Sequence, residues 1–175
     1  MGVQLPCRMT RVVQTHLVLL GDCNMHNTLF GGRLMELIDN TASIAFSRFS
    51  RSLGVTASMD TLNFIKPLPL AHSVCVEAMV SGAGTSSVEV FVKVVGEDVK
   101  TGMRYLAATA FLTFVTLPDE ETGERVTLPT IKPETAEEKF VCGGYKARRQ
   151  DRLSQRTYGE QFNKQIDISN PWVNR

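Results

Sequence analysis

Residues 31–49, GGRLMELIDNTASIAFSRF, predict one long amphipathic helix. Apolar residues recur every three or four positions in this stretch, and polar residues recur with the same spacing on the opposite side. The apolar side carries Leu34, Ile38, Ala42, Ala45 and Phe49. A helix with one apolar face needs a second layer of structure to cover that face.

One β-type segment precedes this helix and four follow it, so the predicted element order is β-α-β-β-β-β. Each segment is rich in β-branched and apolar residues, and turn residues separate the segments. The predicted strands span residues 10–20, 55–65, 73–80, 86–95 and 103–117. One helix packed on an antiparallel sheet of about five strands gives an α+β fold.

The segment 103–117 is the longest of these predicted strands, and it is apolar at both odd and even positions. This pattern is typical of a central strand that is covered on both faces. Because one helix covers only one face of the sheet, we expect another subunit to close part of the other face.

The overall composition is that of an ordinary globular domain. The chain has 175 residues, of which 43% are hydrophobic and 21% are charged. Its net charge of +1 gives no reason to expect nucleic-acid or membrane binding. The longest purely apolar run, residues 17–20, is far shorter than the roughly 20 residues that span a bilayer. The N-terminus lacks a signal pattern, so we expect a cytoplasmic protein.

Four cysteines, Cys7, Cys23, Cys75 and Cys142, are spread along the chain without a CxxC pair. With only three histidines available, this spacing argues against a zinc site. We expect reduced thiols, as in most cytosolic proteins.

Charged residues are denser in the last third of the chain. Residues 1–117 hold nine basic and eight acidic residues, and residues 118–175 hold ten of each. We therefore predict a folded domain over residues 10–120 and a charged, partly helical extension over 121–175. Residues 134–156 begin acidic and end basic, which suits the dipole of a surface helix. A basic patch for phosphates or nucleic acid is the alternative interpretation.

Asp39 is the first candidate catalytic residue, because it lies at the edge of the apolar face of the helix. A carboxylate next to apolar surface is desolvated, which favours its neutral form and suits a general base. The alternative is a side chain that reaches water and has no catalytic role.

The loop before the helix supplies further candidates. The amide of Asn24 could orient a water or a carbonyl group, although a simple Asx turn explains the same residue. Gly31 and Gly32 are poor helix formers, and they suggest that another group approaches the backbone closely. The backbone N–H groups at this helix start could hold an oxyanion or a phosphate.

Other motifs are weaker. Cys23 and His26 could begin a thiol nucleophile, and the Gly-rich segment 82–87 could meet a ligand through its hydroxyl groups or be only a hairpin turn. The sequence has no GxSxG, Walker, GxGxxG or HExxH motif.

The segment 24–39, NMHNTLFGGRLMELID, resembles the signature of hotdog-fold acyl-CoA thioesterases. The resemblance is closest to the cytosolic acyl-CoA hydrolases of animals, which carry two such domains, and to their single-domain bacterial relatives. It covers roughly residues 10–140. Further matching segments are VTASMDTLNF (55–64), GTSS (84–87), MRYLAATAFLTF (103–114) and LPTIKPETAEE (128–138).

This resemblance implies a hotdog fold, in which a curved antiparallel sheet wraps a long central helix. It also implies homodimers whose sheets join edge to edge, assembled as trimers of dimers. The family's catalytic Asp and Asn correspond to Asp39 and Asn24, and they come from opposite subunits. Asn27 departs from the family pattern, in which many members have Gly, so we expect a positive φ at this residue.

The expected reaction is hydrolysis of acyl-CoA to free fatty acid and CoA, without a metal or redox cofactor. Asp39 would activate water or attack the thioester itself, Asn24 would orient the water or the carbonyl, and the N–H groups of Gly31 or Gly32 would hold the oxyanion. The candidates for binding CoA are Thr85, Ser86, Ser87 and Arg104. The alternatives are a non-catalytic acyl-CoA or nucleotide sensor, and a dehydratase. A dehydratase usually needs a histidine base, and the predicted helix has none.

Overall fold

The computed structural model describes residues 3–170 and 172. The chain divides into two compact units, residues 1–143 and 144–175. The first unit runs beyond the boundary that we predicted at residue 120, because a short strand and a helix that follow this position pack with the sheet.

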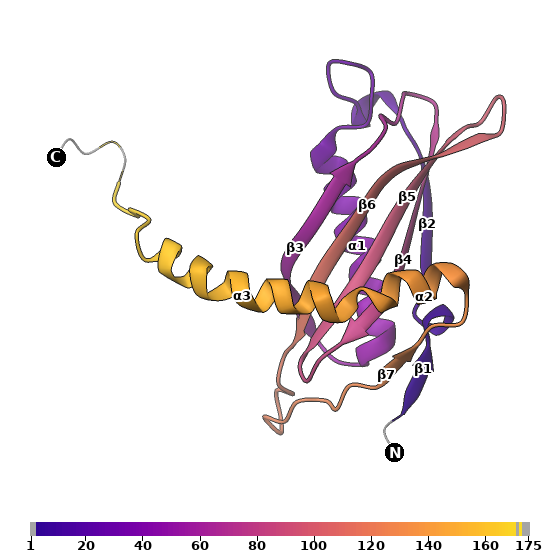
Figure 1. The fold of residues 1–175 in the computed structure, drawn as a ribbon. Coiled ribbons are helices and arrows are strands. Elements are labelled where there is room, and N and C mark those ends of the chain that lie inside the picture. Colours follow the sequence, from indigo (N-terminus) through magenta and orange to yellow (C-terminus); the bar gives the residue numbers. More distant parts are fainter. Residues whose placement is uncertain (1–2, 171, 173–175) are drawn as a thin grey trace. The chain divides into compact units, whose positions relative to one another are not determined.

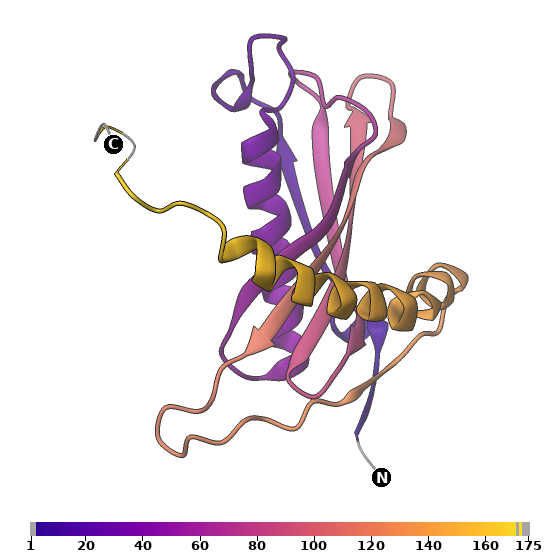
Figure 2. The same ribbon diagram turned by 60° about the vertical axis from the view of Figure 1, so that its left-hand side comes forward.

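The first unit is a helix held against one face of a curved sheet, as the sequence predicts (Figures 1 and 2). The helix α1 spans Gly31–Ser50. The antiparallel five-stranded sheet has the order β2-β4-β5-β6-β3. Its strands are β2 (Val12–Leu17), β3 (Gly54–Phe64), β4 (Ser73–Ala83), β5 (Ser87–Asp98) and β6 (Met103–Thr116).

The main core lies between α1 and the inner face of the sheet. All five apolar residues predicted for the buried side of α1 are buried. On β5 the alternate residues Val88, Val90, Val92 and Val94 are fully buried against this core. The rings of Phe46 and Phe114 stack with their centroids 5.1 Å apart, which joins α1 to β6.

The strand β6 differs from the prediction that both of its faces are covered. Its inner-face residues, such as Ala110, Leu112 and Phe114, are buried, whereas outer-face residues such as Phe111 and Val115 are only half-buried. In the single chain the outer face of β6 is thus only partly covered, and the expected covering by another subunit stays a prediction.

A smaller core covers part of the outer face of the sheet. Cys7, Met79 and Val141 are buried there, and Phe91 and Phe111 pack against them. Outside the five-stranded sheet, the residues of this core come from the short 3-10 helix η1 (Cys7–Met9), β7 (Thr130–Lys132) and α2 (Ala136–Gly143). The strand β1 (Gln4–Pro6) directly precedes η1. β1 and β7 pair in parallel, so the first residues of the chain lie beside the segment that precedes α2.

The second unit is mainly the helix α3, which spans Tyr145–Asn163. The prediction of one helix over 134–156 is wrong, because α2 ends at Gly143 and α3 starts after Gly144. Two consecutive glycines weaken a helix at this point. Within α3, Arg156 pairs with Glu160 at 3.1 Å. No helix in the described part of the chain is long and apolar enough to cross a membrane.

Candidate active site

Asn24 forms the turn that leads into α1. Its Oδ1 accepts the backbone N–H of His26 at 2.9 Å and the hydroxyl of Thr28 at 3.2 Å. The Asx turn that the sequence allows is therefore present. These contacts occupy the side-chain oxygen of Asn24, while its Nδ2 donates no hydrogen bond to any described residue. The turn thus leaves the amide N–H groups of Asn24 available to another molecule.

Asn27 adopts the left-handed backbone conformation that we expected, with φ of 55°. Asparagine tolerates this region better than most residues other than glycine. The Asn27 carbonyl accepts the backbone N–H of Leu70 at 2.9 Å, so the loop keeps its geometry with asparagine at this position.

The first turn of α1 has backbone N–H groups without a side-chain cap. Phe30 is the N-cap residue, and its side chain makes no capping hydrogen bond. The N–H groups of the first helical residues have no acceptor within the helix. A Cβ atom at Gly32 would lie 2.5 Å from the ring of the exposed Phe30, so a larger residue here would require that ring to move. At Gly31 a Cβ atom would be 3.7 Å from the Phe64 ring, which is an ordinary contact.

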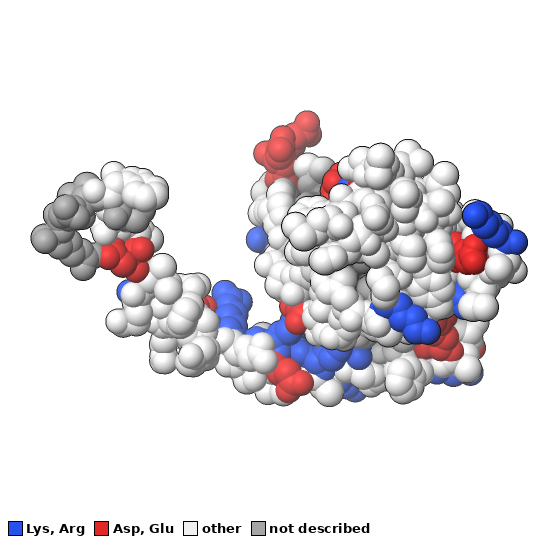
Figure 3. Space-filling view, turned by 90° about the horizontal axis from the view of Figure 1, so that it is seen from above, with Lys and Arg blue, Asp and Glu red and all other residues white. Residues whose placement is uncertain are grey.

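Asn24 and Gly31 line one groove at this end of the sheet. The groove has a volume of about 490 Å³, within the range of small-molecule sites. The segment after β3 forms its other side, with Lys66 as the charged residue among the described lining residues. Figure 3 looks onto the end of the molecule that carries these loops, and most of the surface in the middle of the view is uncharged. Exposed apolar side chains near the groove include Met25, Phe30, Phe64 and Ile65.

Lys66 was not among the residues singled out from the sequence. Its Nζ atom lies 5.9 Å from the centre of the Tyr105 ring. The Tyr105 hydroxyl is 3.0 Å from Nδ1 of His72. Burial and the nearby Asp98 carboxylate raise the pKa of Tyr105, so this hydroxyl stays protonated at neutral pH.

Asp39 lies further along α1 and is held by a residue that the sequence pattern did not identify. Thr56 of β3 donates its hydroxyl hydrogen bond to Oδ1 of Asp39 at 2.8 Å. Asp39 is half-buried, so the desolvation that we expected is incomplete in the single chain. Thr56 is 17 residues away in the sequence, and only the packing of β3 beside α1 brings the two together.

Asn24 and Asp39 do not share a cavity within one chain. Asp39 is not among the described residues that line the groove containing Asn24 and Gly31. It is eight residues beyond Gly31, which corresponds to about 12 Å along the helix axis. The single chain therefore presents two separate groups of candidate functional side chains.

The four candidates for CoA binding also fall into two places. Residues 84–86 form the turn between β4 and β5, and both Ser87 and Val55 pair with Val115 of β6. This turn is thus at the end of the sheet where β3 places Thr56. Arg104 lies at the other end of the sheet, where it pairs with Glu97 of β5 at 3.7 Å. Glu97 is ten residues beyond Ser87 on the same strand, which corresponds to about 33 Å.

The structure does not assemble the thiol nucleophile that Cys23 and His26 could have formed. The Cys23 thiol donates to the carbonyl of Leu19 at 3.3 Å, and His26 is exposed. No hydrogen bond joins the two side chains in the described part of the chain. A histidine base for a dehydratase is likewise missing from α1.

Comparisons with known proteins agree with this architecture. Residues 26–103 match the model of the thioesterase superfamily. The chain is 44% identical to the "Uncharacterized acyl-CoA thioester hydrolase YkhA" of Bacillus subtilis, over 95% of each protein. It is 34% identical to the cytosolic acyl coenzyme A thioester hydrolase of Homo sapiens, over 71% of this chain and 33% of the human protein.

Solved structures of acyl-CoA hydrolases have the same fold. The enzyme of Staphylococcus aureus, in complex with butyryl coenzyme A, coenzyme A and coenzyme A disulfide, superposes with a TM-score of 0.86. That alignment has 35% identity and covers 92% of this chain and 97% of the other. An apo-hexameric acyl-CoA thioesterase gives a TM-score of 0.82 at 33% identity, covering 87% of this chain and 97% of the other.

Proposed function

The chain belongs to the acyl-CoA thioester hydrolases of the thioesterase superfamily, and we propose that Asn24 of one subunit and Asp39 of another form each of its active sites. The enzyme hydrolyses acyl-CoA to a carboxylic acid and CoA. One observation carries the proposal about the site. The groove at the start of α1 contains Asn24 and Gly31, whereas Asp39 lies elsewhere on the same chain.

Asp39 supplies the reactive carboxylate. As a general base it removes a proton from water while the water oxygen attacks the thioester carbonyl. The C–S bond then breaks, and the proton passes from the Asp39 carboxyl group to the departing CoA thiolate. In the other route Asp39 attacks the carbonyl itself, CoA leaves, and water hydrolyses the mixed anhydride. The Thr56 hydroxyl holds the Asp39 carboxylate in place in both routes.

Asn24 and the start of α1 act on the substrate carbonyl. The Asx turn occupies Oδ1 of Asn24, so its amide N–H groups are the part of this groove-lining side chain that can donate to the thioester oxygen or to the attacking water. The backbone N–H of Gly31 or Gly32 stabilises the negative charge that develops on that oxygen. The positive end of the helix dipole adds to this stabilisation.

A second subunit brings the two groups together. β3 is an edge strand of the sheet, and most of its residues are exposed in the single chain. A long exposed edge strand pairs readily with another strand. If two β3 strands pair antiparallel, the groove of one chain lies near the Asp39 of the other. We propose that three such dimers assemble into a hexamer, as the apo-hexameric relative does.

The same pairing could unite the dispersed CoA-binding candidates. The hydroxyls of Thr85, Ser86 and Ser87 lie near one end of the sheet, and Arg104 lies near the other. In an antiparallel dimer, opposite ends of the two sheets meet. We therefore propose that the hydroxyls and the guanidinium that contact one CoA come from different subunits.

The biological setting of the enzyme is also a proposal. We place it in the cytoplasm and in fatty acid metabolism, because the human relative is named as a cytosolic acyl coenzyme A thioester hydrolase. The reaction itself is tested by measuring release of CoA thiol from acyl-CoA of several chain lengths. Binding of acyl-CoA without thiol release would instead indicate the non-catalytic sensor.

A further inference from the structure

Two cysteines that are distant in the sequence lie together on the outer face of the sheet. The Sγ atoms of Cys7 and Cys142 are 3.7 Å apart, although 135 positions separate the residues. Cys7 is fully buried and Cys142 is half-buried. Neither thiol has a role in the hydrolysis described above.

The backbone at Cys7 is firmly anchored. Cys7 opens η1 directly after β1, which pairs with β7. The hydroxyl of the buried Thr10 donates to the Cys7 carbonyl at 2.8 Å and accepts the backbone N–H of Val80 at 3.0 Å. Through these two hydrogen bonds, Thr10 attaches the turn that contains Cys7 to strand β4.

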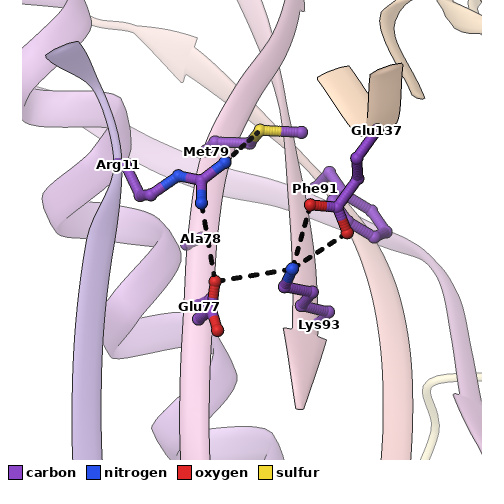
Figure 4. Close-up of a pocket in the computed structure, with 7 residues that line it drawn as sticks. All are labelled: Arg11, Glu77, Ala78, Met79, Phe91, Lys93 and Glu137. Carbon is purple, nitrogen blue, oxygen red and sulfur yellow. Dashed lines mark hydrogen bonds and ion pairs between the residues drawn. The ribbon is translucent and has the colours of Figure 1, made fainter. Parts of the chain in front are cut away.

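The helix that carries Cys142 is anchored on the same face. Figure 4 shows Lys93 of β5 between two carboxylates, Glu77 of β4 and Glu137 of α2. Lys93 lies 3.5 Å from Glu77 and 2.9 Å from Glu137. Arg11 contacts Glu77 at 3.8 Å and the buried Glu138 of α2 at 3.4 Å. These ion pairs hold α2 against β4 and β5 on the face of the sheet where the two sulfur atoms lie.

We propose that Cys7 and Cys142 form a reversible disulfide by exchange with a low-molecular-weight disulfide, such as glutathione disulfide. The half-buried Cys142 reacts first: its sulfur bonds to one sulfur of the small disulfide, and the other half leaves as a thiol with the Cys142 proton. Cys7 then attacks the Cys142 sulfur, and the second half leaves as a thiol with the Cys7 proton. Two protein thiols are oxidised, and one small disulfide is reduced to two thiols.

The surroundings of Cys7 explain this order. The hydrogen bond with Cys142 and burial raise the pKa of Cys7, which makes it a poor nucleophile toward reagents in solution. Once Cys142 carries a mixed disulfide, its sulfur is next to Cys7, and the second step is intramolecular. A disulfide needs the two sulfurs, now 3.7 Å apart, to approach to about 2.05 Å.

The bond would link the two ends of the first unit. Cys142 is in the last turn of α2, directly before Gly143 and the second unit. Oxidation would therefore fix the end of α2 to the N-terminal segment and close a loop that contains most of the chain. Closing so long a loop restricts the unfolded state, and we expect the Tm to rise by roughly 5–10 °C.

The test is oxidation of the whole protein with glutathione disulfide, followed by alkylation of the remaining thiols after denaturation. We expect two of the four thiols to escape alkylation, and a peptide map to join Cys7 to Cys142. The Cys7→Ser variant should stop at the mixed disulfide and gain the mass of one glutathione at Cys142. The matched controls Cys23→Ser and Cys75→Ser should still form the bridge. Dithiothreitol should reverse both the bridge and the Tm shift.

Three results would overturn the proposal. All four thiols could remain after oxidation, a bridge in the wild type could involve Cys23 or Cys75, or Cys7→Ser could still lose two of its three thiols to an internal bridge. The peptide map of the wild-type chain decides the question even if a serine variant does not fold.

Discussion

Asp39 is the residue on which the proposed chemistry depends. Asp39→Asn keeps the shape of the side chain and can still accept the hydrogen bond from Thr56, but it removes the base and the nucleophile. We expect the rate of thiol release to fall about 10²- to 10⁴-fold while the fold and the oligomeric state are kept. The measurement is steady-state hydrolysis of acyl-CoA, with circular dichroism and light scattering as controls. A loss smaller than about fivefold would reject Asp39 as the catalytic carboxylate.

Thr56 positions the Asp39 carboxylate and should affect turnover more than substrate binding. Thr56→Val has nearly the same volume and deletes the hydroxyl that donates to Asp39. A hydrogen bond to a charged group is typically worth 1.5–3 kcal/mol, so kcat should fall about 10- to 100-fold with KM little changed.

The matched control for Thr56→Val is Thr127→Val, since Thr127 lies on an exposed loop of the first unit. This control should retain wild-type activity. If Thr56→Val raised KM and left kcat unchanged, Thr56 would be a substrate-binding residue instead.

Individual residues show how far the sequence could predict this site. The resemblance to a family predicts catalytic roles for Asp39 and Asn24, which stay predictions, and the expected positive φ at Asn27 is confirmed. Thr56 was missed because its contact with Asp39 depends on how β3 packs beside α1, which no local pattern records. The meeting of Cys7 with Cys142 was missed for the same reason, because only the fold brings them together.

The edge strand β3 is the element through which we expect two subunits to join. Thr61 is exposed on β3 in the single chain. Thr61→Glu would place a negative charge in the proposed interface, so we expect the oligomer to dissociate and the activity to fall with it. The same substitution in an exposed loop, Thr127→Glu, should leave the assembly intact. Sedimentation velocity measures the result, and an assembled, active Thr61→Glu protein would place the interface elsewhere.

The helix α2 depends on one buried carboxylate. Burial of Glu138 opposes its ionisation, but the backbone N–H groups of Thr135 and Glu134 and the Arg11 guanidinium outweigh burial and lower its pKa. A lowered folded-state pKa stabilises the protein at neutral pH, and this stabilisation is lost as the pH falls through the folded-state value. Glu138→Gln should lower the free energy of unfolding by about 1–2 kcal/mol at pH 7.

The difference in the free energy of unfolding between Glu138→Gln and the wild type should become smaller as the pH falls below about 4.3, the ordinary pKa of glutamate. Urea unfolding across a pH series measures this difference. The exposed Glu121→Gln serves as the control and should match the wild type at every pH. If the free energy of unfolding of Glu138→Gln differed from that of the wild type by the same amount at every pH, the Glu138 charge would not stabilise α2.

Elements with a strong local period were predicted well, and those defined by packing were not. The helix predicted over 31–49 and the five strands appear within a few residues of their predicted bounds. The region 134–156, predicted as one helix, instead contains α2 and the start of α3. The sequence of acidic and then basic residues indicates where a helix is favourable, but it does not show where the helix is interrupted. The short strands β1 and β7 were missed, since three residues carry no measurable period.

At the scale of the whole molecule, one chain carries the parts of the proposed active site without bringing them together. In our proposal Asn24 and the start of α1 form one half of the site, and Asp39 with Thr56 forms the other. The sequence indicated shared sites only through resemblance to a family, because quaternary packing leaves no period or spacing in a single chain. The central claim is therefore that catalysis requires two subunits.

Mixing two inactive variants tests this claim most directly. Asn24→Ala and Asp39→Ala subunits are combined, and mass spectrometry first confirms that heterodimers have formed. In a heterodimer one site receives both substitutions and the other receives neither, so about a quarter of all sites should be intact after random pairing. The account predicts that thiol release returns to roughly 25% of the wild-type rate. If verified heterodimers stay at the background of the separate variants, Asn24 and Asp39 do not act across subunits.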